Sequence, residues 1–333
     1  MHLALVEEGS KRMQVDVVLC TFNGERFLSA QLDSIERQSR RPDRVLVFDD
    51  GSTDGTLRIL EGFRPRLPLA VTVNPVRLGP AANFSQALGL AIADVVFLCD
   101  QDDVWQPGKV QAILDLLSAR PQVLLACSDA RLIDATGTLM RGSLLARIDA
   151  LSAPQLTAPQ LFEALLRRNL VTGATCAVRR DLLAFALPVP EGFWHDEWLA
   201  LVAAACDGVA WSDRMLTDYR LHDANTAGIE QIGWRATLSG IAIDEVAYQS
   251  AKAKRLAELA AALRRRVTVA KADRLAAVDA AAGHWLARAN RPPWGRGRLS
   301  AVMTEFRRGG YRRFGAGWRS ALRDLWPGSS ASL

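Results

Sequence analysis

Short apolar runs alternate with longer amphipathic stretches through the first half of the chain. The apolar runs predict strands at Val15–Thr21, Arg44–Phe48, Leu69–Val73 and Asp94–Cys99. The intervening stretches place apolar residues at helical spacing and predict helices at Phe27–Gln38, from Asp54, at Pro80–Ala93 and at Pro107–Leu117. Strands that alternate with helices of this length indicate βαβ units. We therefore expect an α/β fold of Rossmann type with a mostly parallel sheet.

The pattern changes after residue 150. It predicts helices at Leu161–Arg168 and Glu197–Cys206. It predicts short strands at Ala174–Val178, Val209–Trp211 and Leu216–Arg220. Beyond Gly228 nearly every residue favours a helix, and the spacing of Leu256, Leu259, Leu263 and Val267 predicts a long amphipathic one. The chain is thus expected to contain an α/β domain over residues 14–228 and a helical extension over residues 229–333.

The composition is that of an ordinary globular protein, with 333 residues, 49% hydrophobic and 23% charged. Five scattered cysteines without a CxxC pair disfavour a zinc site or a disulfide framework and indicate a reduced, cytoplasmic setting. The amino terminus lacks the apolar segment of a secretory signal. The longest apolar stretch, Trp198–Ala205, is far shorter than the roughly 18 residues that a membrane-spanning helix needs. We expect a protein that is soluble or lies on a membrane surface.

Positive charge is concentrated near the carboxyl end. Between Arg291 and Trp326, nine arginines stand against only Glu305 and Asp324, a surplus of +7 in a chain whose net charge is +5. Aromatic residues are interleaved with these arginines, which suits peripheral contact with an anionic membrane. No recognised nucleic-acid motif accompanies them, so no nucleic-acid partner is expected. The alternative is a solvated arm that packs its tryptophans on the domain.

Acidic pairs follow two of the predicted strands. Asp49 and Asp50 close the second strand, and Asp100 and Asp102 close the fourth. Open α/β sheets bind ligands at the carboxyl ends of their strands, where unneutralised acidic pairs are costly. Asp100 and Asp102 are suited to hold Mg²⁺ or Mn²⁺ while a diphosphate completes the coordination. Asp49 or Asp50 is suited to accept the imide N–H of a uracil or thymine ring.

Two loops supply further candidates for nucleotide contact. Cys20–Gly24 closes the first strand and contains Thr21, Asn23 and a glycine that lets the backbone approach a ligand. Arg77 lies just before the predicted helix that contains Asn83, and helix amino termini attract anions. Ordinary turn chemistry would also explain the first loop, and a solvated side chain would explain Arg77.

Four segments in order resemble the motifs of family 2 glycosyltransferases with the GT-A fold: Cys20–Gly24, Asp49–Asp54, Arg77–Asn83 and Asp100–Asp103. The run Asp100–Trp105 resembles the variant found in bacterial rhamnosyltransferases of cell-surface polysaccharide assembly. The resemblance covers residues 14–228. It implies an inverting, metal-dependent transferase with a nucleoside diphosphate sugar as donor, dTDP-L-rhamnose in the variant. The implied acceptor is a saccharide or lipid-linked glycan for O-antigen or a related surface polysaccharide.

The resemblance also implies roles for later residues. Asp196 would be the general base that takes the proton of the acceptor hydroxyl, with Glu197 as the alternative. His222 would contact the metal or the diphosphate, together with Arg220. Gln101 joins the residues expected to bind the nucleotide sugar, which are Thr21, Asn23, Asp49, Asp50, Arg77, Asn83, Asp100, Gln101 and Arg220. Without the upstream motifs, Asp196 would be an acid favoured at a helix amino terminus and His222 a structural histidine.

Two other functions remain as alternatives, a sugar-nucleotide nucleotidyltransferase and a non-catalytic nucleotide-sugar or glycan-binding protein. Nucleotidyltransferases usually carry a glycine-rich, basic loop after the first strand, where this chain has one glycine and Glu25. Asp100, Asp102 and Asp196 are all present, which argues against a non-catalytic binder. Since no spanning helices are predicted, a processive synthase with its own pore is not expected.

Overall fold

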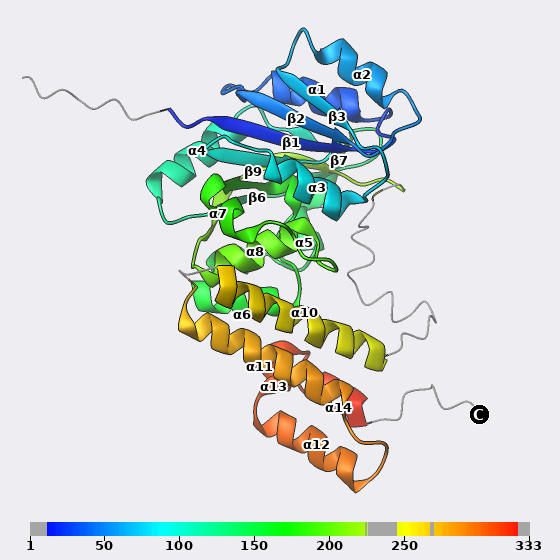
Figure 1. Cartoon of the computed structure of the whole chain (residues 1–333), viewed down its shortest axis with the longest axis vertical. Helices are drawn as coiled ribbons and strands as arrows, with labels where there is room; N and C mark the ends of the chain where they lie inside the picture. The colour runs from blue at the N-terminus through cyan, green and yellow to red at the C-terminus, as the bar shows by residue number, and fades with distance from the viewer. Residues whose placement is uncertain (1–11, 224, 226–244, 267–269, 326–333) are drawn as a thin grey trace, which may run out of the picture.

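A nine-stranded sheet forms the centre of the α/β part of the molecule in the computed structural model (Figure 1). The structure describes residues 12–223, 225, 245–266 and 270–325. The strands are β1 (Val15–Thr21), β2 (Arg44–Asp49), β3 (Leu69–Val73), β4 (Val95–Cys99), β5 (Val104–Trp105), β6 (Leu125–Ile133), β7 (Leu139–Ser143), β8 (Cys176–Arg179) and β9 (Val209–Arg220). The helices of this part are α1 (Leu28–Glu36), α2 (Thr56–Phe63), α3 (Pro80–Gly89), α4 (Lys109–Ala119), α5 (Leu144–Arg147), α6 (Ala158–Arg167), α7 (Arg180–Ala186) and α8 (His195–Ala205), with short 3₁₀ turns η1 (Ala153–Gln155) and η2 (Gly173–Thr175).

The strand order is β3-β2-β1-β4-β8-β6-β9-β5, with β7 paired to β6. β1 runs parallel to β2 and β4, and β2 runs parallel to β3. The β6–β9 pair is also parallel, whereas β5, β7 and β8 join antiparallel. Thr21 is paired with Asp49 in the register of β1 and β2, so the loops after these strands leave the sheet at one edge. The predicted α/β class is confirmed.

Helices cover both faces of the sheet, because side chains along each strand alternate between two cores. One core joins β1, β2 and β4 to α1, α2 and α4, and it includes Leu32, Phe97 and Ile113. The other core joins the same strands to α3, α6, α7 and α8, and it includes Phe48 and Phe84. With both faces covered, the strand ends at the edge of the sheet are where a ligand can reach the parallel strands.

Five helices extend from the α/β part toward the opposite end of the molecule (Figure 1): α10 (Glu245–Arg266), α11 (Ala272–Ala289), α12 (Arg296–Arg307), α13 (Gly310–Phe314) and α14 (Trp318–Leu325). Leu259 and Leu263 of α10 and Val278 of α11 belong to the same core as α6 and α8. Val267, predicted in the long helix, lies outside the described residues. In the described part of the chain, no helix combines the length and the apolar character that crossing a membrane requires.

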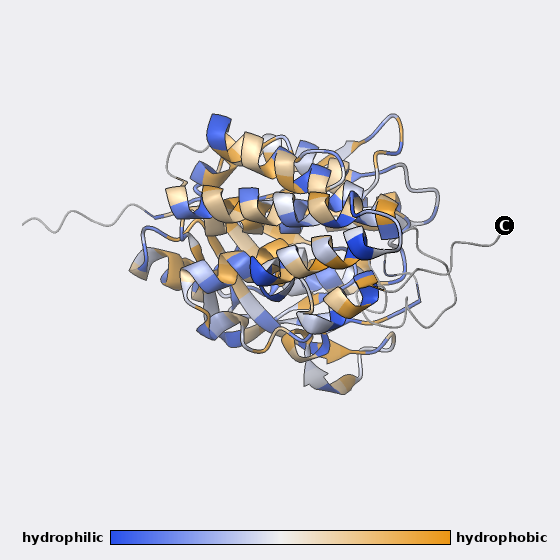
Figure 2. Ribbon diagram, turned by 90° about the horizontal axis from the view of Figure 1, so that it is seen from below, coloured by the Kyte–Doolittle hydropathy of each residue, from blue (hydrophilic) through white to orange (hydrophobic). Residues whose placement is uncertain are grey.

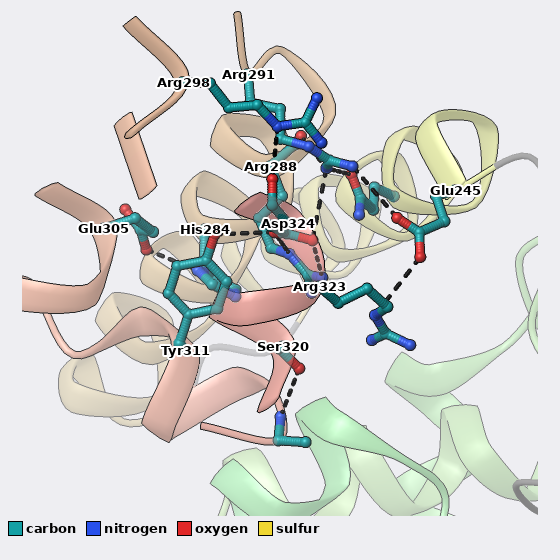
Figure 3. A network of polar contacts seen from close by, with 12 residues as sticks. Glu245, His284, Arg288, Arg291, Arg298, Glu305, Tyr311, Ser320, Arg323 and Asp324 are labelled. Atoms are coloured by element: carbon teal, nitrogen blue, oxygen red, sulfur yellow. Dashed lines mark hydrogen bonds and ion pairs between the residues drawn. The ribbon is translucent and has the colours of Figure 1, made fainter. Parts of the chain in front are cut away.

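A buried polar network ties α14 to α11 and α13 (Figure 3). Asp324 accepts hydrogen bonds from Arg288 Nε (2.7 Å), Arg288 Nη2 (3.0 Å) and the Tyr311 hydroxyl (2.8 Å). Burial alone would raise the pKa of Asp324, but the hydrogen bonds and charge of Arg288 hold it below its ordinary value. Beside this group, His284 Nδ1 lies 2.7 Å from Glu305 Oε1. The last helices are therefore folded onto the molecule through their charged residues.

The structure corrects several predictions. β6 has no predicted counterpart, since Asp129 and Arg131 interrupt its apolar pattern. The two strands predicted within Val209–Arg220 form the single strand β9. Pro107 does not begin α4, which starts at Lys109 with Gly108 as its cap.

The expectation of a solvated arm that packs its tryptophans is not met by the described tryptophans of this segment. Trp294 and Trp318 are 64% and 61% exposed. Trp326 lies outside the described residues. The exposed indoles thus sit on a folded helical surface.

Candidate active site

Acidic side chains from distant segments converge beside the carboxyl end of β4. Asp100 and Asp102 follow β4 directly, and Asp196 comes from the first turn of α8. Burial and the charges of Asp102 and Asp196 raise the pKa of Asp100 to about 7. Burial disfavours the charged form of a carboxyl, and nearby like charges add to that effect. The structure thus brings Asp196 beside two acids from which it is far apart in the sequence.

His222 lies against one of these acids. Its Nε2 is 2.8 Å from Asp102 Oδ2, and its side chain is only 5% exposed. The imidazole ring also contacts the ring of Phe27, with the centroids 4.6 Å apart. Two of the three predicted metal ligands are therefore neighbours. Among the described residues, no group of three or more His, Cys, Asp or Glu side chains could hold a metal ion.

Arg220 is buried and holds the loop that contains Asp102 and Asp103 through hydrogen bonds. Its backbone N–H donates to Asp103 (2.9 Å), and its Nε donates to the carbonyl of Asp102 (2.7 Å). Its Nη1 donates to the carbonyl of Asp134 (3.2 Å), and the guanidinium lies 4.8 Å from the centroid of the Phe27 ring. These contacts fix the loop that carries Asp102. Direct contact of Arg220 with a diphosphate stays a prediction.

Asp49 is saturated by hydrogen bonds within the protein. Oδ2 accepts from the hydroxyls of Thr21 (2.7 Å) and Ser52 (2.6 Å). Oδ1 accepts from the backbone N–H groups of Ser52 (2.8 Å) and Gly51 (3.2 Å). A carboxylate offers about four acceptor positions, and all four are filled here. Asp49 and Thr21 therefore connect the loops after β1 and β2 through their hydrogen bond.

Asp50 retains acceptor capacity. Its Oδ1 accepts from Asn74 Nδ2 (2.9 Å) and from the backbone of Leu78 (2.7 Å). Its Oδ2 accepts only from the backbone of Gly79 (2.8 Å) among the described residues. One of its roughly four acceptor positions is thus left for a ligand. Of the two neighbouring carboxylates, Asp50 is the better placed to receive a base N–H.

Two predicted asparagines hold loops in place. Asn83 donates from Nδ2 to the carbonyl of Phe48 (2.9 Å), and its Oδ1 accepts from Asn74 (2.8 Å). Asn23 adopts a left-handed backbone conformation with φ of 48°. Its Oδ1 accepts the backbone N–H of Thr53 (2.9 Å). Both side chains therefore shape the edge of the sheet on which the acids lie.

Gln101 and Arg77 meet around one aromatic residue. Gln101 accepts the backbone N–H of Phe22 (2.9 Å) and donates to its carbonyl (3.1 Å). The guanidinium of Arg77 lies 3.7 Å from the centroid of the Phe22 ring. Gly24 is needed beside them, because an added Cβ would lie 2.3 Å from Gln101 Oε1. Arg77 is exposed at this edge and remains a candidate for phosphate or base contact.

Asp196 is held by two backbone donors. Oδ2 accepts the N–H of Gly173 (3.0 Å), and Oδ1 accepts the N–H of Glu197 (2.7 Å). Burial outweighs these bonds and raises the pKa of Asp196 to about 6. A carboxyl with this pKa is ionised at neutral pH and is more basic than an ordinary aspartate, which suits proton abstraction.

Glu197 faces a different partner. It forms an ion pair with Arg255 of α10, and the guanidinium of Arg255 lies 4.4 Å from the centroid of the Phe193 ring. Burial raises the pKa of Glu197, while Arg255 opposes that rise. The extension thus engages the acid that the sequence leaves as the alternative base, which favours Asp196 for that role.

Gly173 sets a close contact beneath Asp196. A Cβ added there would lie 2.9 Å from His195 Nε2 and 3.7 Å from Asp196 Cβ. Substitution of Gly173 by alanine is expected to displace Asp196 and to lower kcat by about 10²-fold, since small misplacements of a reacting group have effects of this size. Steady-state kinetics checks this, with Gly62→Ala as the control because an added Cβ there has open space. Equal kcat for both variants would contradict it.

Lys109 is a site residue that the sequence analysis misses. Its Nζ is buried and donates to the carbonyl of Ala174 (2.6 Å) and to Thr217 Oγ1 (2.9 Å). Burial lowers its pKa to about 8, and the nearby acids, Asp103 and Asp100 among them, act against that shift. The sequence signal that could have found Lys109 is its position four residues before Ile113, which places a lysine on the apolar face of α4. A cation there offsets part of the negative charge of the cluster.

Residues 16–183 match the model described as glycosyl transferase family 2, and this match covers half of the chain. The chain belongs to glycosyl transferase family 2. This confirms the predicted family, and the matched residues include the loops after β1, β2 and β4. The contacts of Asp49, Asp50, Asp100 and Asp102 are thus contacts within a family 2 domain.

Curated relatives of this family 2 chain are distant. An uncharacterized glycosyltransferase of Nostoc sp. is 24% identical over 226 residues, which are 64% of this chain and 66% of that protein. A dTDP-rhamnosyl transferase of Shigella flexneri is 33% identical over 105 residues, which are 30% of this chain and 36% of that protein. The chain therefore spans slightly less than two thirds of the first relative and about a third of the second.

Solved structures share the fold of this family 2 chain. TarS of S. aureus in complex with UDP-GlcNAc has a TM-score of 0.56 at 17% identity, covering 94% of this chain and 80% of that chain. The mannosyltransferase PcManGT of Pyrobaculum calidifontis in complex with GDP-Man and Mn²⁺ has a TM-score of 0.51 at 19% identity, covering 94% and 85%. The predicted GT-A fold is confirmed.

Proposed function

We propose that the chain transfers a sugar from a nucleoside diphosphate donor to a hydroxyl of a saccharide or lipid-linked glycan, with inversion at the anomeric carbon. The observation that carries the proposal is the convergence of Asp100, Asp102 and Asp196 at the strand ends of a family 2 domain. Family membership disfavours a nucleotidyltransferase. A buried carboxyl whose pKa is raised, as that of Asp196 is, disfavours a non-catalytic binder.

The nucleotide end of the donor is assigned to the loops after β1, β2 and β3. Asp50 accepts the imide N–H of the base through its remaining acceptor position, and Arg77 contacts the base or a phosphate. Thr21, Asn23, Asp49, Asn83 and Gln101 keep these loops in position. The likeness to a dTDP-rhamnosyl transferase supports dTDP-L-rhamnose as the donor. The resemblance of Asp100–Trp105 to the rhamnosyltransferase variant suggests surface polysaccharide, such as O-antigen, as the product.

Mg²⁺ or Mn²⁺ is assigned to Asp100 and Asp102, with His222 beside Asp102, although among the described residues these side chains do not form a metal site on their own. Burial raises the pKa of Asp100 most, the charges of Asp102 and Asp196 add to that rise, and a cation would offset these charges; a protein solved with Mn²⁺ shares the fold. A site with two carboxylates suits an ion whose remaining ligands are diphosphate oxygens and water. When bound, the ion would neutralise the charge of the departing diphosphate.

The chemistry at the acceptor is assigned to Asp196. Its carboxylate takes the proton from the acceptor hydroxyl while that oxygen forms a bond to the anomeric carbon. The bond between this carbon and the diphosphate breaks on the opposite face, and the diphosphate leaves with the electron pair. Gly173 holds the base, whereas the pairing of Glu197 with Arg255 keeps that acid apart from the reaction.

We assign catalysis to residues 14–228 and membrane contact to the extension over residues 229–333. Cytoplasmic localisation at the inner face of the plasma membrane is consistent with five free cysteines. The net positive charge of the last helices supports contact with an anionic surface.

A donor panel tests the proposed function. Purified protein is mixed with UDP-, GDP- and dTDP-sugars, with Mg²⁺, Mn²⁺ or chelator, and thermal shift and nucleoside diphosphate release are followed. We expect metal-dependent stabilisation and slow hydrolysis with one donor. No response to any donor with either metal would overturn the proposal.

The Asp102→Asn variant sharpens the metal assignment. Removing one anionic ligand is expected to weaken metal-dependent donor binding by at least about tenfold, because each carboxylate supplies charge as well as an oxygen. Asp115→Asn is the control, since Asp115 is exposed on α4 and accepts a hydrogen bond from Gln111 of the same helix. Unchanged metal dependence in Asp102→Asn would remove this residue from the site.

A further inference from the structure

The last helices expose apolar side chains at helical spacing. Leu299, Met303 and Phe306 of α12 recur at i, i+4 and i+7, and Trp318 and Leu322 of α14 recur at i and i+4. We call these five residues the apolar stripe. Other residues of the two helices, Val302 of α12 and Ala321 of α14, are buried in a separate small core together with Tyr311 of α13. The exposure of the stripe is therefore a feature of folded helices that already have an inner face.

Positive charge surrounds the apolar stripe. The exposed arginines of this segment are Arg296, Arg307, Arg308, Arg312, Arg313, Arg319 and Arg323. Within the described residues, only Arg313 and Arg323 of this set lie within ion-pair distance of a carboxylate. The segment's own acids, Glu305 and Asp324, are buried and face His284 and Arg288. The other five exposed arginines therefore have no carboxylate within ion-pair distance in the described part of the chain.

The position of these helices suits contact with an extended surface. They lie at the end of the molecule farthest from the sheet (Figure 1). Figure 2 looks at the molecule from this end and shows hydrophobic and hydrophilic residues alternating along its helices. An interfacial helix of a peripheral protein combines an apolar face with basic residues on its flanks.

We propose that α12 and α14 dock on an anionic lipid bilayer, with the apolar stripe inserted among the headgroups and the exposed arginines paired with lipid phosphates. This inference deepens the proposed membrane contact of the extension, on which it rests, by naming the face that makes it. Arginines near an anionic leaflet are attracted to it. Apolar and aromatic side chains settle at the boundary between headgroups and acyl chains.

Other occupants fit less well. Nucleic acid would pair with the arginines but would leave Leu299, Met303 and Leu322 in water. A second copy of the same face would cover the stripe but would oppose like charges. An anionic lipid bilayer would both cover the apolar stripe and pair its phosphates with the arginines. We therefore favour the bilayer as the occupant of this face.

Vesicle binding tests the proposal with the full chain. Co-sedimentation is measured with vesicles of phosphatidylcholine alone and of phosphatidylcholine with phosphatidylglycerol in equal amounts. We expect binding to the anionic vesicles, little binding to the neutral ones, and weakening as salt is raised. Absence of binding to anionic vesicles, or equal binding to both kinds, would overturn the proposal.

Two variants separate charge from apolar contact. Arg307→Gln, Arg308→Gln and Arg312→Gln together are expected to lower vesicle affinity by about 100-fold, since each arginine contributes roughly fivefold. Leu299→Gln with Met303→Gln is expected to lower it by at least about tenfold. Matched controls carry the same changes at exposed positions elsewhere, Arg37, Arg120 and Arg141 for charge and Leu90 with Ile92 for the apolar pair.

The outcomes separate docking from catalysis. Loss of vesicle binding in both docking variants but not in the controls, with donor hydrolysis in solution unchanged, supports the proposal. Affinity that stays at the wild-type value in both docking variants contradicts it, as does preferential binding to an RNA or DNA duplex over vesicles. If wild-type protein binds anionic vesicles but shows neither stabilisation nor hydrolysis with any donor, the proposed function fails while the docking face stands.

Discussion

The Asp196→Asn variant is expected to lose transfer activity by about 10²–10⁴-fold while binding the donor with unchanged affinity. Asparagine keeps the shape of the side chain and its contact with Gly173 but cannot accept the proton of the acceptor hydroxyl, and a general base contributes this factor. Transfer is measured as kcat with a defined acceptor, and donor binding is measured by thermal shift. Full activity in the variant would remove Asp196 from the role of base.

The pH profile provides an independent readout of the same group. Only the ionised carboxylate can take a proton, so kcat/KM of the wild type should rise with pH, reach half of its maximum near the Asp196 pKa of about 6 in the free protein, and then level off. The matched control is Glu197→Gln, which breaks the ion pair with Arg255 but leaves Asp196 ionisable. We expect this control to keep the rising limb. If the rise with pH disappeared in Glu197→Gln and persisted in Asp196→Asn, Glu197 rather than Asp196 would be the general base.

The Asp324→Ala variant is expected to lower the free energy of unfolding by about 3–5 kcal/mol. The change leaves the Arg288 side chain, 2% exposed, without its carboxylate, and an uncompensated buried charge has a cost of this size. Urea titration measures the effect. Asp279→Ala is the control, because its ion pair with Arg264 is about half exposed on both sides and should contribute less than about 1 kcal/mol.

A paired substitution tests the cause. Arg288→Met combined with Asp324→Leu removes both charges, so most of the lost stability should return. Since the pKa of Asp324 is held below its ordinary value, its contribution is complete above about pH 4 and disappears as the pH falls through the folded-state pKa. A double variant as unstable as Asp324→Ala would show that packing, rather than charge pairing, holds α14.

The parallel half of the sheet could be predicted because β1, β2 and β4 are buried and, like the short edge strand β3, read as apolar runs. Observed β1 and β3 coincide with their predicted ranges. β6 could not be found in this way, because Arg131 and its partner Asp218 on β9 form an ion pair across the sheet. A strand that contains a charged residue is predicted as a loop as long as the residue's partner on another strand is unknown.

The residues of the candidate site likewise fall into those that the sequence pattern predicts and those that only the structure reveals. The acids after β2 and β4 could be predicted because each cluster is contiguous in the sequence and follows its strand. Lys109 and Arg255 were not found, because their partners Ala174 and Glu197 lie in other segments. The distinction between Asp49 and Asp50 also required the structure, since it depends on which hydrogen-bond positions are already filled.

The helical extension acts as a spacer if its last helices rest on the bilayer. The sheet lies at the other end of the molecule from α12 (Figure 1). Asp100 and Asp102 follow β4 of this sheet, so they would be held away from the headgroups. A sugar attached directly to the lipid would then lie below the reach of Asp196, whereas the tip of a longer glycan would arrive level with it. The height of the molecule would select acceptors by length, and the enzyme would extend glycans that others had begun.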